Sequence, residues 1–120
     1  AEAAEVLRGT PLARSANAQG NLVLGNSERL QYMDREGIDV AALTINPFWY
    51  AADRPLARDL CRVQNEKLSA FCAANASRFV ALASVALQHP DLAADQLDEA
   101  VTKLGLRGAG IGGSVVYHRP

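Results

Sequence analysis

Three apolar runs, each preceded by a helical pattern, constrain the fold of this chain more than any other feature of its sequence. The runs cover residues 38–45, 78–87 and 108–116. Few polar residues interrupt them, so they do not alternate between a buried face and a solvent face. Such runs are typical of strands that are covered on both faces, as in a parallel sheet.

The segments before these runs have helical spacing. Residues 27–36 are predicted to form a short helix that ends at Gly37, and apolar residues recur at helical intervals through 54–76. Pro90 opens a third predicted helix, which ends at Gly105. Strands separated by helices of this length must be parallel and joined by right-handed crossovers. The sequence therefore predicts an α/β fold.

The 120 residues are expected to make a single partial domain. Residues 1–26 are predicted to be a loop-rich N-terminal segment, and residues 27–120 a series of consecutive βα units. Three parallel strands with three helices cannot cover both faces of a sheet and protect its edges. The chain also begins with Ala1 rather than Met, so we expect further strands from a longer protein.

Composition excludes several classes of partner. The formal charge is −1, with 12 Lys and Arg against 13 Asp and Glu, which gives no basic patch for nucleic acid or an acidic membrane surface. No run approaches the roughly 20 apolar residues of a membrane-spanning helix, and the first residues do not resemble a signal peptide. Cys61 and Cys72 lie too far apart on one predicted helix for a disulfide. We therefore expect a cytoplasmic protein.

Candidate ligand contacts follow the first two apolar runs, because loops after parallel strands are where α/β proteins place ligand sites. The first run leads directly into Asn46, Phe48, Trp49 and Tyr50. These four residues could equally form a hydrophobic lid on the helix predicted at 54–76. His89 follows the second run, and its alternative role is a helix-entry residue bonded to a nearby carbonyl.

Other conspicuous residues are predicted to be structural. The helical pattern predicts that Asn65 and Glu66 lie on the exposed face of their helix. Arg78 and Arg107 precede strands, at the end opposite the ligand side, where an ion pair or a helix C-terminal contact is expected. The glycines of 108–113 lack the order of a dinucleotide fingerprint and are expected to let a backbone or a ligand come close.

Seven short motifs occur in an order that resembles one enzyme family, and they span about eighty residues. They are Arg29, Met33-Asp34, Gly37-Ile38-Asp39, Asn65-Glu66, Arg78-Phe79, Pro90-Asp91-Leu92-Ala93 and Leu106-Arg107-Gly108. The chain resembles the amidohydrolase-related metal-dependent TIM barrels typified by aminocarboxymuconate semialdehyde decarboxylase.

The resemblance implies part of a (β/α)8 TIM barrel, about strands 2 to 4 with their helices. It implies a lyase or hydrolase that uses a divalent metal, with zinc expected, for decarboxylation, hydration or hydrolysis of a small carboxylated substrate. The family's His-x-His and its later histidine and aspartate ligands have no counterparts here. We therefore predict no metal ligand and no catalytic residue in this chain, and no activity of the chain alone.

In this family the loop after strand two lies near the substrate pocket. The predicted substrate contacts are accordingly Asn46, Phe48 and Trp49, together with His89. A second hypothesis is a non-catalytic α/β binding or structural module, which would complete its sheet as a homo-oligomer. Decarboxylation and hydrolysis are both compatible with the motifs.

Overall fold

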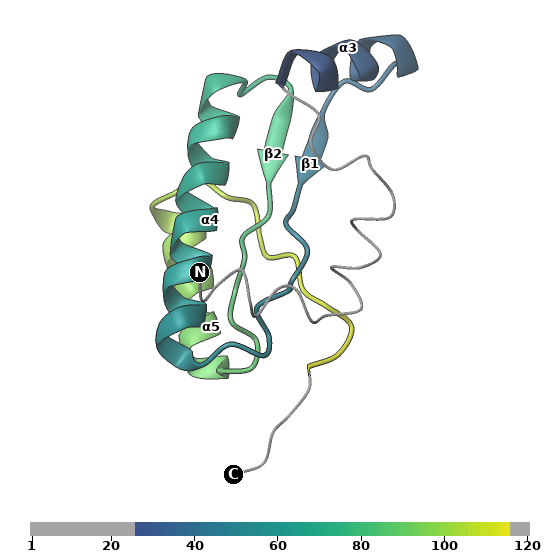
Figure 1. Cartoon of the computed structure of the whole chain (residues 1–120). Coiled ribbons are helices and arrows are strands. Elements are labelled where there is room, and N and C mark those ends of the chain that lie inside the picture. The colour runs from purple at the N-terminus through teal and green to yellow at the C-terminus, as the bar shows by residue number, and fades with distance from the viewer. Residues whose placement is uncertain (1–25, 116–120) are drawn as a thin grey trace.

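A computed structural model describes residues 26–115 (Figure 1). Helices and strands alternate along the chain in the predicted order. The elements are α3 (Asn26–Glu36), β1 (Ala41–Leu43), α4 (Arg54–Ala74), β2 (Phe79–Ala81) and α5 (Pro90–Thr102). The predicted loop-rich segment lies outside the described residues, except for residue 26, which begins α3.

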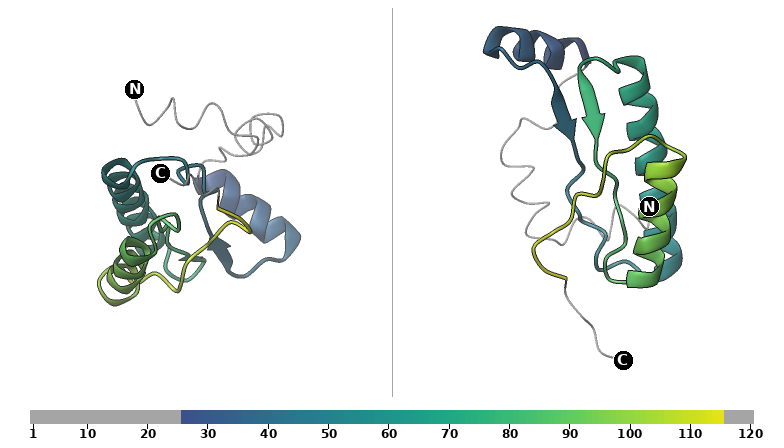
Figure 2. Two further views of the ribbon diagram at one scale, coloured as in Figure 1. Left: turned by 90° about the horizontal axis from the view of Figure 1, so that it is seen from below. Right: turned by 180° about the vertical axis from the view of Figure 1, so that it is seen from behind.

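The two strands are parallel, as predicted. Ala41 pairs with Phe79 and Leu43 pairs with Ala81. Helices α4 and α5 lie side by side on one face of this sheet, whereas α3 lies apart from them at the end where the strands begin (Figures 1 and 2). This arrangement fits consecutive βα units of an α/β barrel, in which each strand is followed by a helix on the outer side.

The third apolar run differs from its prediction. Its described part, 108–115, makes a single parallel bridge, between Ala109 and Ala83, and no longer strand. Four of the first six residues of this run are glycines, which weaken a strand because they add backbone entropy and have no side chain to pack. The first two strands are likewise shorter than the apolar runs that contain them.

Two hydrophobic clusters join the helices to the sheet. The buried residues of the first are Trp49, Ala52, Ala57, Cys61, Ala86 and Leu92. Those of the second are Ala81, Ala83, Ala100 and Leu106. The second cluster consists mostly of alanine, and it includes Ala100 of α5 together with Ala81 at the end of β2.

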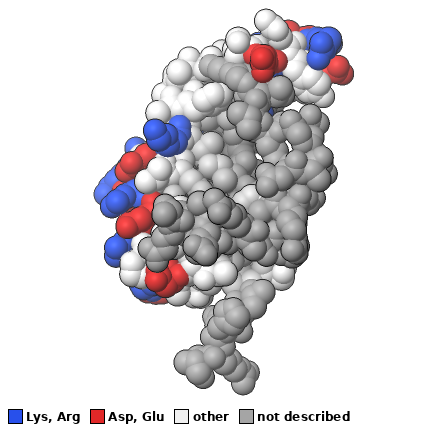
Figure 3. Space-filling view, in the orientation of Figure 1, with Lys and Arg blue, Asp and Glu red and all other residues white. Residues whose placement is uncertain are grey.

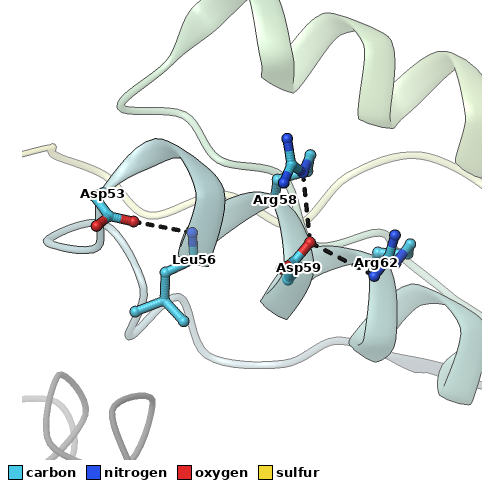
Figure 4. Close-up of polar contacts among 5 residues, drawn as sticks. All are labelled: Asp53, Leu56, Arg58, Asp59 and Arg62. Atoms are coloured by element: carbon cyan, nitrogen blue, oxygen red, sulfur yellow. Dashed lines mark hydrogen bonds and ion pairs between the residues drawn. The ribbon is translucent and has the colours of Figure 1, made fainter.

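Helix α4 begins with a side-chain cap. The Asp53 carboxylate accepts a hydrogen bond from the Leu56 N–H at 3.0 Å (Figure 4). Pro55 lies in the first turn, where its missing N–H costs nothing. The cap fixes where the loop after β1 ends and the helix begins.

Charges on the outer surface of α4 are mixed in sign. Asp59 lies 3.4 Å from Arg58 and 3.5 Å from Arg62, in exposed pairs that contribute little stability (Figure 4). Acidic and basic side chains also lie intermixed along the left edge of the molecule, where α4 runs (Figure 3). Within the described part of the chain, no helix is long and apolar enough to cross a membrane.

Arg78 ties together the ends where the strands begin. Its guanidinium pairs with Asp34 at 2.7 Å and donates to the carbonyl oxygens of Asp39 and Ile38 at 2.8 and 3.0 Å. The predicted structural role of Arg78 is confirmed. The Arg107 side chain is exposed and no ion pair to it is found within residues 26–115, so its structural role stays a prediction.

The outer edge of β1 has no neighbouring strand among the described residues. Ile38 and Val40 beside it are 37% and 52% exposed. A groove of about 420 Å³ runs along this side, lined by Arg29, Leu43, Thr44, Ile45, Lys67, Leu68 and Phe71. An exposed apolar edge of this kind is normally covered in a folded protein.

An ion pair connects the first turns of α4 and α5. Arg54 donates to both carboxylate oxygens of Asp91, at 3.0 and 2.6 Å. These hydrogen bonds lower the pKa of Asp91 from 3.8 to about 2. Because the pKa is lower in the folded state, the pair stabilises the fold above pH ~4, and this contribution is lost as the pH falls toward ~2.

We therefore expect Asp91→Asn to reduce the pH dependence of the unfolding midpoint between about pH 4 and pH 2. High salt should have the same effect, because both side chains are exposed. Thermal unfolding followed by circular dichroism at several pH values measures this. Asp98→Asn, on the same helix, is the control and should keep the wild-type pH dependence. Identical profiles for the wild type and Asp91→Asn would contradict the assignment.

Candidate functional site

The candidate site lies where the strands end, which we call the carboxyl rim. β1 and β2 share their last described backbone hydrogen bond where the Leu82 N–H donates to the Leu43 carbonyl at 2.8 Å. Beyond this point Ala83 exchanges backbone hydrogen bonds with Gly108 and Gly110, and the next residues are bonded by side chains where β1 no longer pairs. We call residues 84–89 the rim segment.

The first side chain to take the place of β1 is Asn65 of α4. Its amide oxygen accepts from the Ser84 N–H at 2.6 Å, and its amide nitrogen donates to the Ser84 carbonyl at 2.9 Å. A side-chain amide has the same donor and acceptor groups as a peptide. Asn65 therefore continues the hydrogen-bond ladder of β2 beyond the point where β1 stops pairing with it. Both residues are buried, at 3% and 2% exposure. The prediction of an exposed face was therefore wrong for Asn65, although Glu66 is exposed.

The next peptide group of the rim segment, between Val85 and Ala86, is held in the same way. The Trp49 indole N–H donates to the Val85 carbonyl at 2.9 Å. The Gln96 amide oxygen, from α5, accepts from the Ala86 N–H at 2.7 Å. Three side chains from three parts of the chain thus fix consecutive residues of the rim segment.

Trp49 is fully buried, with 0% exposure. It packs with Ala57 and Cys61 of α4, and its ring meets Tyr50 edge-on at 6.0 Å between centroids. This buried position agrees with the alternative that the aromatic residues after β1 form a hydrophobic lid on α4. The enclosed indole presents no surface to a substrate in this structure, which differs from the contact expected for it.

The other predicted contacts lie on the rim. Asn46 is exposed and Phe48 is half-buried, and both belong to the loop between β1 and α4. His89 is half-buried at the N-cap of α5, where its side chain makes no capping hydrogen bond. In the described part of the chain its Nε2 atom is buried without a partner, so it does not bond the nearby carbonyl that the alternative required.

The glycine-rich run packs against the same loop. A Cβ atom at Gly110 would overlap the Thr44 hydroxyl and lie 3.9 Å from the Leu82 Cβ. The expectation that these glycines allow a close approach is confirmed for Gly110. In barrels, side chains of alternate strands meet in the interior, and Thr44 and Gly110 meet across the intervening strand in this manner. The Gly112 N–H also donates to the Tyr50 hydroxyl at 2.9 Å.

Neither cysteine has the properties of a nucleophile. Both are free thiols, as predicted, and burial raises the pKa of Cys61 to about 12. Burial also raises the pKa of Cys72. Within residues 26–115, no three His, Cys, Asp or Glu residues are grouped so that they could hold a metal ion.

Comparisons with known proteins identify similar sequences and structures. The family model described as amidohydrolase matches residues 25–116. Gamma-resorcylate decarboxylase of Rhizobium sp. (strain MTP-10005) is 38% identical over 87 residues, which are 71% of this chain and 27% of that protein. The 2-amino-3-carboxymuconate-6-semialdehyde decarboxylase of Dictyostelium discoideum is 30% identical over 89 residues, 72% of this chain and 25% of that protein.

A solved structure is also similar to this chain. Dihydroxybenzoic acid decarboxylase from Polaromonas sp. JS666, with bound manganese and the inhibitor 2-nitroresorcinol, is 29% identical with a TM-score of 0.71. The match covers 83% of this chain and 31% of that one. The chain thus spans about a quarter of the length of the curated relatives it matches.

Trp49→Ala is expected to destabilise the fold by about 3–5 kcal/mol, because it leaves a cavity in the core. Trp49→Phe keeps much of the packing but removes the donor to Val85, and should cost about 1–3 kcal/mol. Urea unfolding followed by circular dichroism measures both losses. Tyr32→Ala, at a side chain that is 46% exposed, is the control. A Trp49→Ala loss no larger than that of the control would contradict this placement.

Proposed function

Because the chain belongs to the amidohydrolase family, we propose that it forms part of a longer metal-dependent decarboxylase that acts on small carboxylated aromatic compounds. The observation that carries this proposal is the 38% identity to gamma-resorcylate decarboxylase over most of the chain. In this proposal the described residues form about strands 2 to 4 of the barrel and supply one side of its carboxyl rim. Active sites of such barrels lie at that face.

The rim residues have suitable chemistry for an aromatic acid. The Asn46 amide can donate to a carboxylate or phenol oxygen, and the Phe48 ring can pack against an aromatic ring. His89 offers an imidazole nitrogen that has no partner in the described structure. We propose that these three residues contact the substrate. Trp49 positions them from the core by fixing the loop against the rim segment.

The metal of the proposed enzyme does not fit the residues described here, because they contain no cluster of suitable ligands. We therefore assign its ligands to other parts of the longer enzyme. Zinc was expected from the sequence resemblance, and the Polaromonas relative binds manganese. We propose a divalent cation of one of these two kinds. The free cysteines support a cytoplasmic location.

The alternative function, a non-catalytic module that forms a homo-oligomer, is favoured by one feature. The outer edge of β1 is free within the described part of the chain, and apolar residues lie beside it. A second copy could pair with such an edge. Sedimentation of the purified 120-residue chain separates the hypotheses, since the module predicts a defined dimer.

We expect the longer protein, loaded with manganese or zinc, to convert 2,6-dihydroxybenzoate into resorcinol and carbon dioxide. The bond between the ring and the carboxyl carbon breaks, and a proton takes its place on the ring. Liquid chromatography of the product measures this, with chelator-treated enzyme as the control. Lack of turnover with both metals on hydroxybenzoates would contradict the proposal.

The 120-residue chain alone should show no turnover and no tight zinc site. The physical reason is the missing set of ligands in its described part. Isothermal titration with zinc measures this. A stoichiometric, tight site would show that the assignment of the metal ligands is wrong.

A further inference from the structure

Two side-chain amides, from two different helices, hold the rim segment. Asn65 of α4 bonds both polar groups of the Ser84 backbone, and Gln96 of α5 accepts from the Ala86 N–H. Buried backbone groups require partners, and β1 provides none at this point. The course of the rim segment is therefore set by the positions of Asn65 and Gln96.

The rim segment also carries polar atoms that have no partner among the described residues. They are Ser84 Oγ, Gln88 Oε1 and His89 Nε2, and each is buried. Buried polar atoms in folded proteins are nearly always paired. A hydroxyl group can donate, an imidazole nitrogen can donate or accept, and an amide oxygen accepts. Ser84 is almost fully enclosed, whereas Gln88 and His89 are half-buried, so of these three residues only Gln88 and His89 are open to a ligand at the rim.

The Gln88 side chain connects the rim segment to the loop after β1. Its amide nitrogen donates to the Trp49 carbonyl at 2.7 Å and points toward the Ala52 carbonyl at 3.3 Å. The indole of Trp49 in turn donates to Val85. A displacement of the rim segment would therefore also displace the loop that carries Asn46 and Phe48.

We infer that Asn65 and Gln96 are positioning residues for substrate binding, an inference that rests on the proposed function. They hold the rim segment, and through its contacts with Trp49 the loop after β1, so that His89, Asn46 and Phe48 meet a hydroxylated aromatic acid. They touch no substrate themselves, because both act through the backbone of the rim segment. A merely structural role would lower stability and leave the kinetic constants of the folded enzyme unchanged.

The test uses Asn65→Asp and Gln96→Met in the longer protein. Aspartate keeps the acceptor for the Ser84 N–H but loses the donor to the Ser84 carbonyl, and methionine removes the acceptor for Ala86. Glu66→Gln, beside Asn65 but exposed, is the matched control. Kinetics with 2,6-dihydroxybenzoate are measured where circular dichroism shows each variant to be folded. Hydrogen exchange of peptides covering 84–89 is measured with and without this compound.

We expect kcat/KM to fall about 10- to 100-fold in both variants, because small displacements at a site have effects of this size. The control should stay within about twofold of the wild type. Exchange in the rim segment should be faster in Asn65→Asp, and 2,6-dihydroxybenzoate should slow it in the wild type.

Wild-type kcat and KM in the folded variants would overturn the inference. If Asn65→Asp does not fold, Gln96→Met decides by the same criterion. Turnover by the wild type with no effect of 2,6-dihydroxybenzoate on rim-segment exchange would also overturn it. A wild type without any turnover contradicts the proposed function itself, and the inference falls with it.

Discussion

The pairing of the Asn65 amide with the Ser84 backbone determines how the carboxyl rim is built. The ladder between the two strands ends at Leu43 and Leu82, and two polar groups of Ser84 would then be buried without partners. Each such group costs about 1–3 kcal/mol. Asn65 satisfies both of them, and Trp49 and Gln96 bond the carbonyl and the N–H of the peptide group between Val85 and Ala86.

The order of elements could be predicted from the sequence because burial leaves a periodic pattern. Continuous apolar runs indicated parallel strands between helices, and both described strands are parallel. The structural role of Arg78 could be predicted as well, since a cation just before a strand lies near several backbone carbonyls. Such signals depend on local sequence and on burial alone.

The anchors of the rim could not be predicted in this way. Asn65 and Gln96 are polar residues on amphipathic helices, and helical periodicity assigns such residues to the surface. Their partners lie 19 and 10 residues away, and nothing in the sequence links them. Trp49 was a candidate contact because of its place after a strand, whereas its indole lies in the core. The third apolar run was expected to be a full strand, but its glycines allow close packing against Thr44 instead.

In this proposal the substrate binds at the carboxyl rim, against the loop after β1 and the rim segment, and Asn65 holds the rim segment in place. A crystal structure of the longer protein with 2,6-dihydroxybenzoate bound tests this claim most directly. We expect ligand oxygens within hydrogen-bond distance of residues 84–89, and the Asn65 amide still paired with Ser84. A ligand that contacts neither the rim segment nor residues 46–50, or a Ser84 backbone paired with a neighbouring strand in place of Asn65, would contradict it.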